Sequence, residues 1–430
     1  MGAAWRQHMF KKTLCLVATA ALASFVYANE IDQADIEIVV DAKGNASLNQ
    51  PTSLVTTVTA EDIETAGISS IHDVFTDLFL LPISGDSVGN GVLGFPDLGG
   101  FGEAAKSNTL ILLNGRPLNN PTLEAPNLSF IPLNSIAKID VYQGGASTLF
   151  GSGATGGVIN IVTKQNALIY ENQIYAQTGS FGYGKTGVNT ATQLNNSLTL
   201  SANADFVTKD GYRHHTDFAN SAGSITISSQ TFNHRWKVSY TNSFQQRKDA
   251  GAATVANVSE DRKTPGSTSI LDHRTELFFA DLSLQNESTQ YNFHLSHRDS
   301  SQVGEYVGCC PIDQYTKVTN IDVTGQNSDT NQIAGLALQH AAYNQSYFAS
   351  PRYQDRIDVF VRQRISIYDG SQTVGGAKVA YVDDRVSSSN SKKQNTIAGE
   401  IMHTIETNFG SLGLGIDRAY RYANLDENAA

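Results

Sequence analysis

Residues 144–164 read GGASTLFGSGATGGVINIVTK, a glycine-dense segment that runs into a stretch rich in β-branched residues. Six glycines between 144 and 157 permit backbone conformations that other residues avoid and let two backbones approach closely. The run at 157–163 is predicted to be a β-strand. Upstream, 139–142 and 109–113 are predicted strands, and the latter ends in the turn Asn114-Gly115. These segments predict a small, closely packed domain.

The N-terminal half of this domain carries helix signals. Residues 54–58 form a short predicted strand, and Thr59 is a predicted helix cap with Asp62 as the carboxyl three residues later. A second short helix is predicted over 71–81, because its apolar residues recur at helical spacing. We therefore expect an α/β domain over residues 51–165.

From Tyr170 onward the pattern has period two, with apolar residues on one face and Asn, Gln, Ser, Thr, Lys and Asp on the other. A sandwich with one solvated face would also alternate. Many strands joined alternately by short turns (182–184, 195–196) and long polar loops (247–272, 299–330) favour a membrane barrel instead. Alternating segments are 197–206, 236–241, 279–285, 291–296, 357–362, 377–382 and 412–416.

Composition agrees with a large β protein. The 430 residues include 30 Lys+Arg and 41 Asp+Glu, for a net charge of -11, and charged residues make up 17% of the chain. The 36 glycines, 17 tyrosines and 19 phenylalanines argue against disorder, because disordered chains have few aromatics. An acidic chain also lacks the basic surface of a nucleic-acid-binding protein, so we expect no nucleic-acid partner.

Residues 1–28 have the composition of a secretory signal. Lys11 and Lys12 precede an apolar run at 13–25, and Val26-Tyr27-Ala28 is a small-x-small cleavage site. A membrane anchor is the alternative, but 13 apolar residues are too few to span a bilayer. In an oxidising compartment the adjacent Cys309 and Cys310 are expected to form a loop disulfide, either with each other or with a partner outside this chain, and a soft-metal site is the alternative.

Three segments, at 108–119, 128–141 and 144–164, resemble the plug of TonB-dependent outer-membrane receptors. The resemblance implies an α/β plug followed by an antiparallel transmembrane barrel of about 22 strands in the outer membrane of a Gram-negative bacterium. Residues 166–430 supply about ten to twelve strands, so an incomplete, truncated barrel is expected. The plug signature is assigned to Asn114, Gly115, Arg116, Gly151, Gly153, Gly156, Gly157 and Asn160.

Between the signal and the plug, residues 29–50 are assigned as a TonB box and linker. The box resembles the run Asp35, Ile36, Glu37, Ile38, Val39, Val40, Asp41 and Ala42. An extended, β-branched segment there could add a strand to the sheet of a partner. The alternative is an ordinary first strand of the plug. The resemblance implies TonB–ExbB–ExbD, a metal-chelate ligand and outer-membrane lipid as partners.

The implied function is energy-coupled import of a scarce ligand, such as an iron-siderophore, haem, cobalamin or similar metal chelate. A passive channel is disfavoured, because neither a plug nor a box helps diffusion. A surface ligand-binding protein, including a receptor for phage or bacteriocin, or a non-transporting remnant is the alternative. We expect no enzyme activity, catalytic residues, cofactor or metal site. The histidines at 214, 215, 294 and 297 are interpreted as surface or lumen residues without function, and Asp383 and Asp384 as solvated loop charges.

Overall fold

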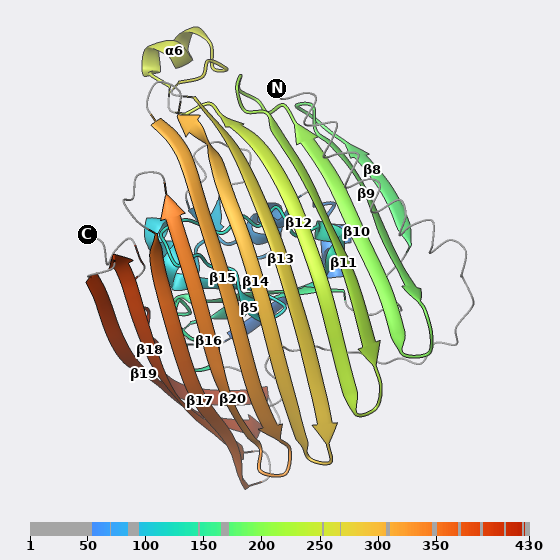
Figure 1. Cartoon of the computed structure of the whole chain (residues 1–430), viewed down its shortest axis with the longest axis vertical. Coiled ribbons are helices and arrows are strands. Elements are labelled where there is room, and N and C mark those ends of the chain that lie inside the picture. The colour runs from blue at the N-terminus through green and yellow to red at the C-terminus, as the bar shows by residue number, and fades with distance from the viewer. Residues whose placement is uncertain are drawn as a thin grey trace.

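The computed structural model describes residues 54–425 except 69, 85–93, 145–146, 165–171, 252, 267, 307–309, 346–350, 369–370, 388–389, 408–409 and 424. The predicted signal sequence, the predicted TonB box and Cys309 lie outside the described residues. The described part forms a small mixed sheet with short helices, followed by one large antiparallel sheet that curves around it (Figure 1).

The small domain, called the plug below, has a five-stranded sheet in the order β1-β6-β7-β4-β5. Strands β4 and β7 run parallel, and the other neighbours run antiparallel. The predicted strands are confirmed, and the one predicted at 139–142 is longer at both ends. The elements are β1 (Leu54–Thr59), α2 (Ala60–Thr65), α3 (Ile71–Asp73), the π-helix η1 (Val74–Leu78), β2 (Ile83–Ser84), β3 (Phe95–Pro96), the 3-10 helix η2 (Gly102–Ala104), α4 (Ala105–Asn108), β4 (Thr109–Leu113), β5 (Arg116–Pro117), the 3-10 helix η3 (Leu133–Ser135), β6 (Ile136–Gln143), α5 (Ser147–Phe150) and β7 (Gly157–Thr163).

The predicted cap at Thr59 is confirmed. The Asp62 N–H donates to Thr59 Oγ1 (3.3 Å), and Asp62 Oδ2 accepts the Thr59 N–H (2.7 Å), which makes a reciprocal capping box. The hydrogen bonds from the Thr59 backbone and side chain lower the pKa of the Asp62 carboxyl below its ordinary value. These local bonds fix the start of α2.

The helix predicted over 71–81 begins where expected but ends early. It is α-helical only over α3, continues as the π-helix η1, and ends at Leu78. Leu80 takes a left-handed backbone (φ 54°) and Pro82 follows, so the chain leaves the helix before Leu81. The prediction of a helix to Leu81 is therefore wrong at its C-terminal end.

The large sheet has 13 strands, β8 to β20, each paired with its neighbours in sequence, one more than the upper end of the expected range. The sheet is antiparallel throughout, as expected for a barrel wall, and is called the wall below. Its strands are β8 (Gln173–Thr178), β9 (Gly184–Gln193), β10 (Leu198–Lys209), β11 (Phe218–Gln230), β12 (His234–Asp249), β13 (Ser269–Asn286), β14 (Thr289–Tyr306), β15 (Cys310–Asn327), β16 (Gln332–Gln345), β17 (Arg352–Tyr368), β18 (Ser371–Ser387), β19 (Asn390–Thr407) and β20 (Gly410–Arg418).

One of the predicted loops is not a loop. The segment 299–330 continues β14 and contains all of β15, so it is mostly strand. Near the α6 end its outward side chains include charged residues, and Lys317 pairs with Asp299 across the two strands at 2.8 Å. This polarity on both faces concealed the strand from the periodicity argument. The loop predicted at 247–272 is confirmed in shorter form, between β12 and β13, and it carries α6 (Val255–Glu260).

The two ends of the wall differ. One end has turns such as 231–233 and 287–288, and the other carries the connections 210–217 and 250–268 with α6 (Figure 1). Outer-membrane barrels have short periplasmic turns and longer extracellular loops. The end bearing α6 therefore corresponds to the extracellular side.

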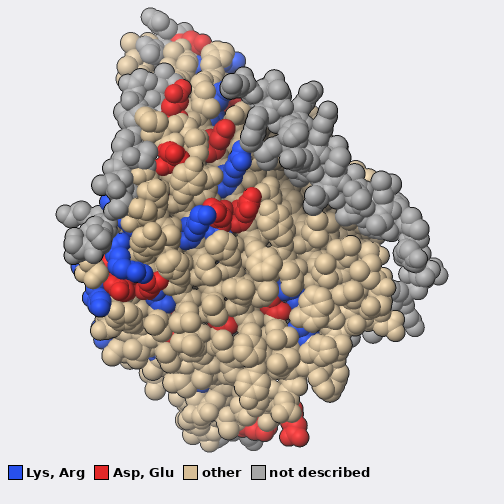
Figure 2. Space-filling model, viewed as in Figure 1, with Lys and Arg blue, Asp and Glu red and all other residues tan. Residues whose placement is uncertain are grey.

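The outward face of the wall carries an apolar belt. Strand pairing aligns one residue from each of β12 to β19 in a continuous apolar row: Trp236, Leu282, Phe293, Val323, Leu336, Val359, Val379 and Ile397. A second row nearer the α6 end contains Asn242, Glu276, Asp299 and Lys317. Figure 2 shows this boundary, with charged groups gathered above a mostly uncharged lower area. An apolar band between polar margins is typical of a lipid-facing barrel surface.

Replacing Val359 by arginine is expected to lower the free energy of unfolding by about 2–4 kcal/mol, since the belt row lies within the apolar band. Val359 is 54% exposed, so the penalty would come from lipid contact rather than from core packing. Unfolding from lipid vesicles measures it. The control is Asn242→Arg in the charged row, which should change stability by no more than about 1 kcal/mol. Equal effects of the two substitutions would contradict a lipid-facing belt.

Within the described residues, no helix has the length and hydropathy needed to cross a bilayer. The plug core contains Phe75, Ile111, Ile139 and Ile159, all fully buried. Two wall residues, Leu277 and Phe279 of β13, belong to the same cluster. The plug and the wall therefore share part of one hydrophobic core.

Candidate functional site

The Asn114-Gly115 turn joins β4 to β5 and presents Arg116 to the wall. Both turn residues have positive φ (50° and 77°), as a two-residue hairpin turn requires. Asn114 Oδ1 accepts the Thr163 N–H at 2.9 Å, and the Gly115 N–H donates to Asn160 Oδ1 at 3.0 Å. Arg116 Nη1 donates back to the Asn114 carbonyl at 3.0 Å. The structure thus brings together four residues of the predicted signature.

Arg116 ends in a buried cluster of charged and polar groups on β12, β13 and β14. Its guanidinium forms an ion pair with Asp281. Asp281 also lies 3.7 Å from Lys237 Nζ and 2.9 Å from His294 Nδ1, and Arg116 Nη2 lies 3.2 Å from the same His294 nitrogen. We call Arg116, Lys237, Asp281 and His294 the anchor cluster. It joins a plug hairpin to three neighbouring wall strands.

The anchor cluster sits over an aromatic ring. The Arg116 guanidinium lies 4.9 Å and Lys237 Nζ 4.8 Å from the centroid of Phe279. Burial lowers the pKa of the Arg116 guanidinium to about 10, opposed by the negative charge of Asp322, so the group stays protonated at neutral pH. Loss of one partner from a buried ion pair costs several kcal/mol, because the other charge is left uncompensated. This contact therefore holds the plug firmly in its present position.

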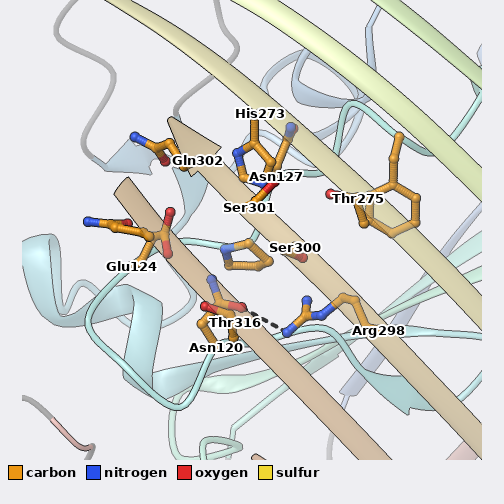
Figure 3. Close-up of a pocket in the computed structure, with 13 residues that line it drawn as sticks. Asn120, Glu124, Asn127, His273, Thr275, Arg298, Ser300, Ser301, Gln302 and Thr316 are labelled. Atoms are coloured by element: carbon orange, nitrogen blue, oxygen red, sulfur yellow. Dashed lines mark hydrogen bonds between the residues drawn. The ribbon is translucent and has the colours of Figure 1, made fainter. Parts of the chain in front are cut away.

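A second contact lies nearer the α6 end, between the plug segment 118–130 and β13 to β15 (Figure 3). The Arg298 guanidinium donates to the Leu118 carbonyl and to Asn120 Oδ1, the latter at 2.8 Å. Beside it is a crevice of about 10 Å³, roughly the room of one water molecule. The crevice is lined by Asn120, Glu124, Pro126, Asn127, Phe130, His273, Thr275, Arg298, Ser300, Ser301, Gln302, Gln314 and Thr316.

The glycine signature lies at close approaches of the plug backbone. A Cβ at Gly151 would overlap Arg356 Nη2 of β17, and a Cβ at Gly156 would overlap the Leu98 carbonyl oxygen. A larger residue at Gly156 would collide with backbone, whereas at Gly151, whose φ is 91°, it would be strained and would displace the Arg356 side chain. Gly153 and Gly157 lie in the same segment, so the predicted signature residues occupy two places, the hairpin turn and this tight loop.

The segment after β20 holds the same part of the plug from the other side. The Tyr420 N–H donates to Ser147 Oγ at 3.1 Å, and the Tyr422 N–H donates to Ser152 Oγ at 3.0 Å. The Leu425 N–H donates to the Pro121 carbonyl at 2.9 Å. These contacts were not predicted.

Two interpretations from the sequence require correction, that of His294 and that of Asp383 and Asp384. His294 is part of the anchor cluster rather than a histidine without a role. Asp383 and Asp384 lie in β18 rather than in a loop, and Asp384 is fully buried and accepts a hydrogen bond from Gln354 Nε2 at 2.9 Å. Within the described residues, no group of three or more His, Cys, Asp or Glu side chains is arranged to hold a metal ion.

Several functional candidates were missed altogether. These candidates lie at inward positions of strands for which the sequence predicts alternation over part of the length: Asp281, Lys237 and Arg298. Alternation shows that a polar residue faces inward, but it does not show which plug residue lies opposite. The sequence signal for these residues is that each is a charged residue at an inward strand position, where most of the other residues are polar and uncharged.

Comparison with known proteins agrees with this architecture. The TonB-dependent Receptor Plug Domain family matches residues 26–158. The vitamin B12 transporter BtuB of Photobacterium profundum is 29% identical over 197 residues, 44% of this chain and 30% of that protein. The BtuB of Vibrio vulnificus is 27% identical over 211 residues, 47% of this chain and 33% of that protein. The matched region thus spans about a third of the length of these relatives.

Solved structures share the fold. The ferric citrate transporter FecA has a TM-score of 0.74 at 12% identity, covering 90% of this chain and 66% of that one. The ferric yersiniabactin uptake receptor FyuA of Yersinia pestis has a TM-score of 0.69 at 13% identity, covering 86% and 65%. The fold is that of an outer-membrane receptor in which barrel strands surround a plug. Residues 26–158 thus match the plug domain of TonB-dependent receptors, and the described residues share the fold of such receptors.

Proposed function

We propose that this receptor imports a metal chelate across the outer membrane, with energy delivered by TonB–ExbB–ExbD through residues 35–42. The observation that carries the proposal is the anchor cluster, because it fixes the plug to β12, β13 and β14 through a buried ion pair. A plug movement that took Arg116 away would leave Asp281 buried without this partner. A ligand larger than water needs this plug to move, and a pull on the N-terminal segment would supply the work.

The ligand is proposed to be a chelate with many neutral hydrogen-bonding groups, such as a corrinoid. The crevice between the plug and the wall is lined by the amides of Asn120 and Asn127 on the plug and of Gln302 and Gln314 on the wall. Amide groups both donate and accept hydrogen bonds, which suits a ligand that carries amides of its own. The two BtuB relatives are named vitamin B12 transporters, which supports the same class. A ferric siderophore is the second candidate, supported by the fold shared with FecA and FyuA.

A binding panel distinguishes these ligands. Outer membranes that carry the receptor are expected to bind cyanocobalamin saturably and to bind ferric citrate and haem no better than membranes without it. Gln302→Leu should weaken cyanocobalamin binding up to about tenfold, the equivalent of one lost hydrogen bond. The matched control is Gln246→Leu on the outward side of β12, where the amide donates to Asp272 Oδ1 at 2.8 Å. Saturable binding of ferric citrate without cyanocobalamin binding would overturn the corrinoid assignment.

A further inference from the structure

The inward face of β13 passes three environments in order. His273 and Thr275 line the crevice at the α6 end. Asp281 holds Arg116 in the anchor cluster. Ser283 and Gln285 then line a hollow of about 640 Å³ at the end with short turns. A single strand thus connects a nearly closed crevice, a plug contact and an open hollow.

Strand β14 repeats this order, and β12 repeats its last two environments. On β14, Arg298 lines the crevice, His294 lies in the anchor cluster and Gln290 lines the hollow. On β12, Lys237 lies in the anchor cluster and Arg235 lines the hollow. The full order therefore holds on two adjacent strands, and its last two environments extend to a third.

The hollow has a distinct lining. Its side chains come from β9 to β14 and the turns between them, and none of the residues that line it belongs to the plug. Most are amides and hydroxyls, including Gln193, Thr199, Gln230 and Gln290, and the basic groups are His234 and Arg235. Neutral groups of this kind form hydrogen bonds of small net strength, which a moving solute can exchange one after another.

The wall formed by β17 to β19 is different. Arg362 Nε donates to Glu400 Oε1 at 2.6 Å, and both side chains are buried. Arg356 forms an ion pair with Asp358, and the plug backbone at Gly151 packs directly against this pair. Buried ion pairs therefore line both walls next to the plug, and a crevice of about 30 Å³ also lies between the plug and β15 to β18. The difference lies beyond the plug, where the hollow lined mainly by amides and hydroxyls is on the β9 to β14 side.

We propose that the imported solute passes along the inward face of β12, β13 and β14, with Arg116 as the gate. Release of Arg116 from Asp281 joins the crevice to the hollow and opens the route toward the periplasm. The proposal rests on the import function above and adds the wall along which import occurs and the residue that closes it. Its solute class is a neutral, hydrogen-bonding chelate, in keeping with the lining of both the crevice and the hollow.

Narrowing the hollow tests the route. In the variant Gln230→Trp/Gln285→Trp, two large side chains enter the hollow far from the plug. Uptake of radiolabelled cyanocobalamin by whole cells is expected to fall at least about tenfold, while binding at the cell surface changes less than about twofold. The single variant Gln290→Trp on β14 should give a smaller loss of uptake and serves if the double variant does not assemble.

The matched control places the same residues on the other wall. Gln372→Trp/Thr404→Trp changes a directly paired position on β18 and β19 at the same end of the sheet. Lys378 and Glu400 are buried on the inward face. Gln372 and Thr404 lie an even number of residues from them on the same strands, so their side chains also point inward. This control should take up cyanocobalamin within about twofold of the wild-type rate.

The outcomes separate the route from the function. If the variants with tryptophan in the hollow took up cyanocobalamin at the wild-type rate, the proposed route would be overturned and the proposed function would stand. The same holds if the control Gln372→Trp/Thr404→Trp lost as much uptake as those variants. Absence of cyanocobalamin uptake by the wild-type receptor would overturn the route together with the proposed function.

Discussion

Asp281→Asn is expected to lower the free energy that holds the plug in the wall by about 3–5 kcal/mol. The substitution keeps the size of the side chain but removes the carboxylate that Arg116, Lys237 and His294 share. Arg116 is 6% exposed, so water cannot replace the lost partner. Two basic side chains would then face each other over Phe279 without the negative charge between them.

Protease digestion of the plug at increasing denaturant measures this loss, because a plug that leaves the wall becomes accessible to cleavage. The matched control is Asp272→Asn on the outward side of the same strand, where the carboxylate accepts one hydrogen bond from Gln246. Asp272→Asn should shift the denaturant concentration at which half of the plug is cleaved by the equivalent of no more than about 1 kcal/mol.

A double-mutant cycle with Arg116→Gln measures the interaction energy between Arg116 and Asp281 separately from their contacts with other residues. Because the two residues are in direct contact, the double variant Arg116→Gln/Asp281→Asn is expected to lose less than the sum of the single losses, by about 0.5–3 kcal/mol. Additive losses, or an Asp281→Asn variant as stable as the Asp272→Asn control, would show that the anchor cluster does not hold the plug.

Local features of this chain could be read from its sequence. The turn Asn114-Gly115 and the capping box of Thr59 and Asp62 depend on residues next to each other, and both are confirmed. The apolar strands of the plug were equally clear, because burial on both faces gives a continuous apolar run. The glycine-rich segment gave the resemblance to a receptor plug, and the plug-domain model matches residues 26–158.

Features that depend on distant residues could not be read. Arg116 and Asp281 lie far apart in sequence, and no periodicity shows that they meet. The strand β15 carries polar residues on its outward face near the α6 end, so it was interpreted as a loop. Asp384 was interpreted as a solvated charge for the same reason, although Gln354 on the neighbouring strand satisfies it in a buried position.

Deletion of residues 35–42 is expected to abolish uptake while leaving surface binding intact. We propose that this segment is the point at which TonB pulls, and it lies before the first described strand of the plug. An extended segment can join the edge of a partner sheet through main-chain hydrogen bonds. Without it, no pull would reach the plug, and the anchor cluster would stay closed.

A control deletion of the same length, residues 43–50, removes part of the linker and keeps the segment 35–42. It should retain most of the uptake, because the box can still reach a partner. Normal binding without uptake in both deletions would indicate that linker length, rather than the box, carries the effect.

The most direct test of energy-coupled import is the uptake of radiolabelled cyanocobalamin by cells that carry the 35–42 deletion, measured beside surface binding in the same cells. We expect uptake at the level of cells without the receptor and binding equal to that of the wild type. Uptake at the wild-type rate in these cells would contradict coupling through this segment.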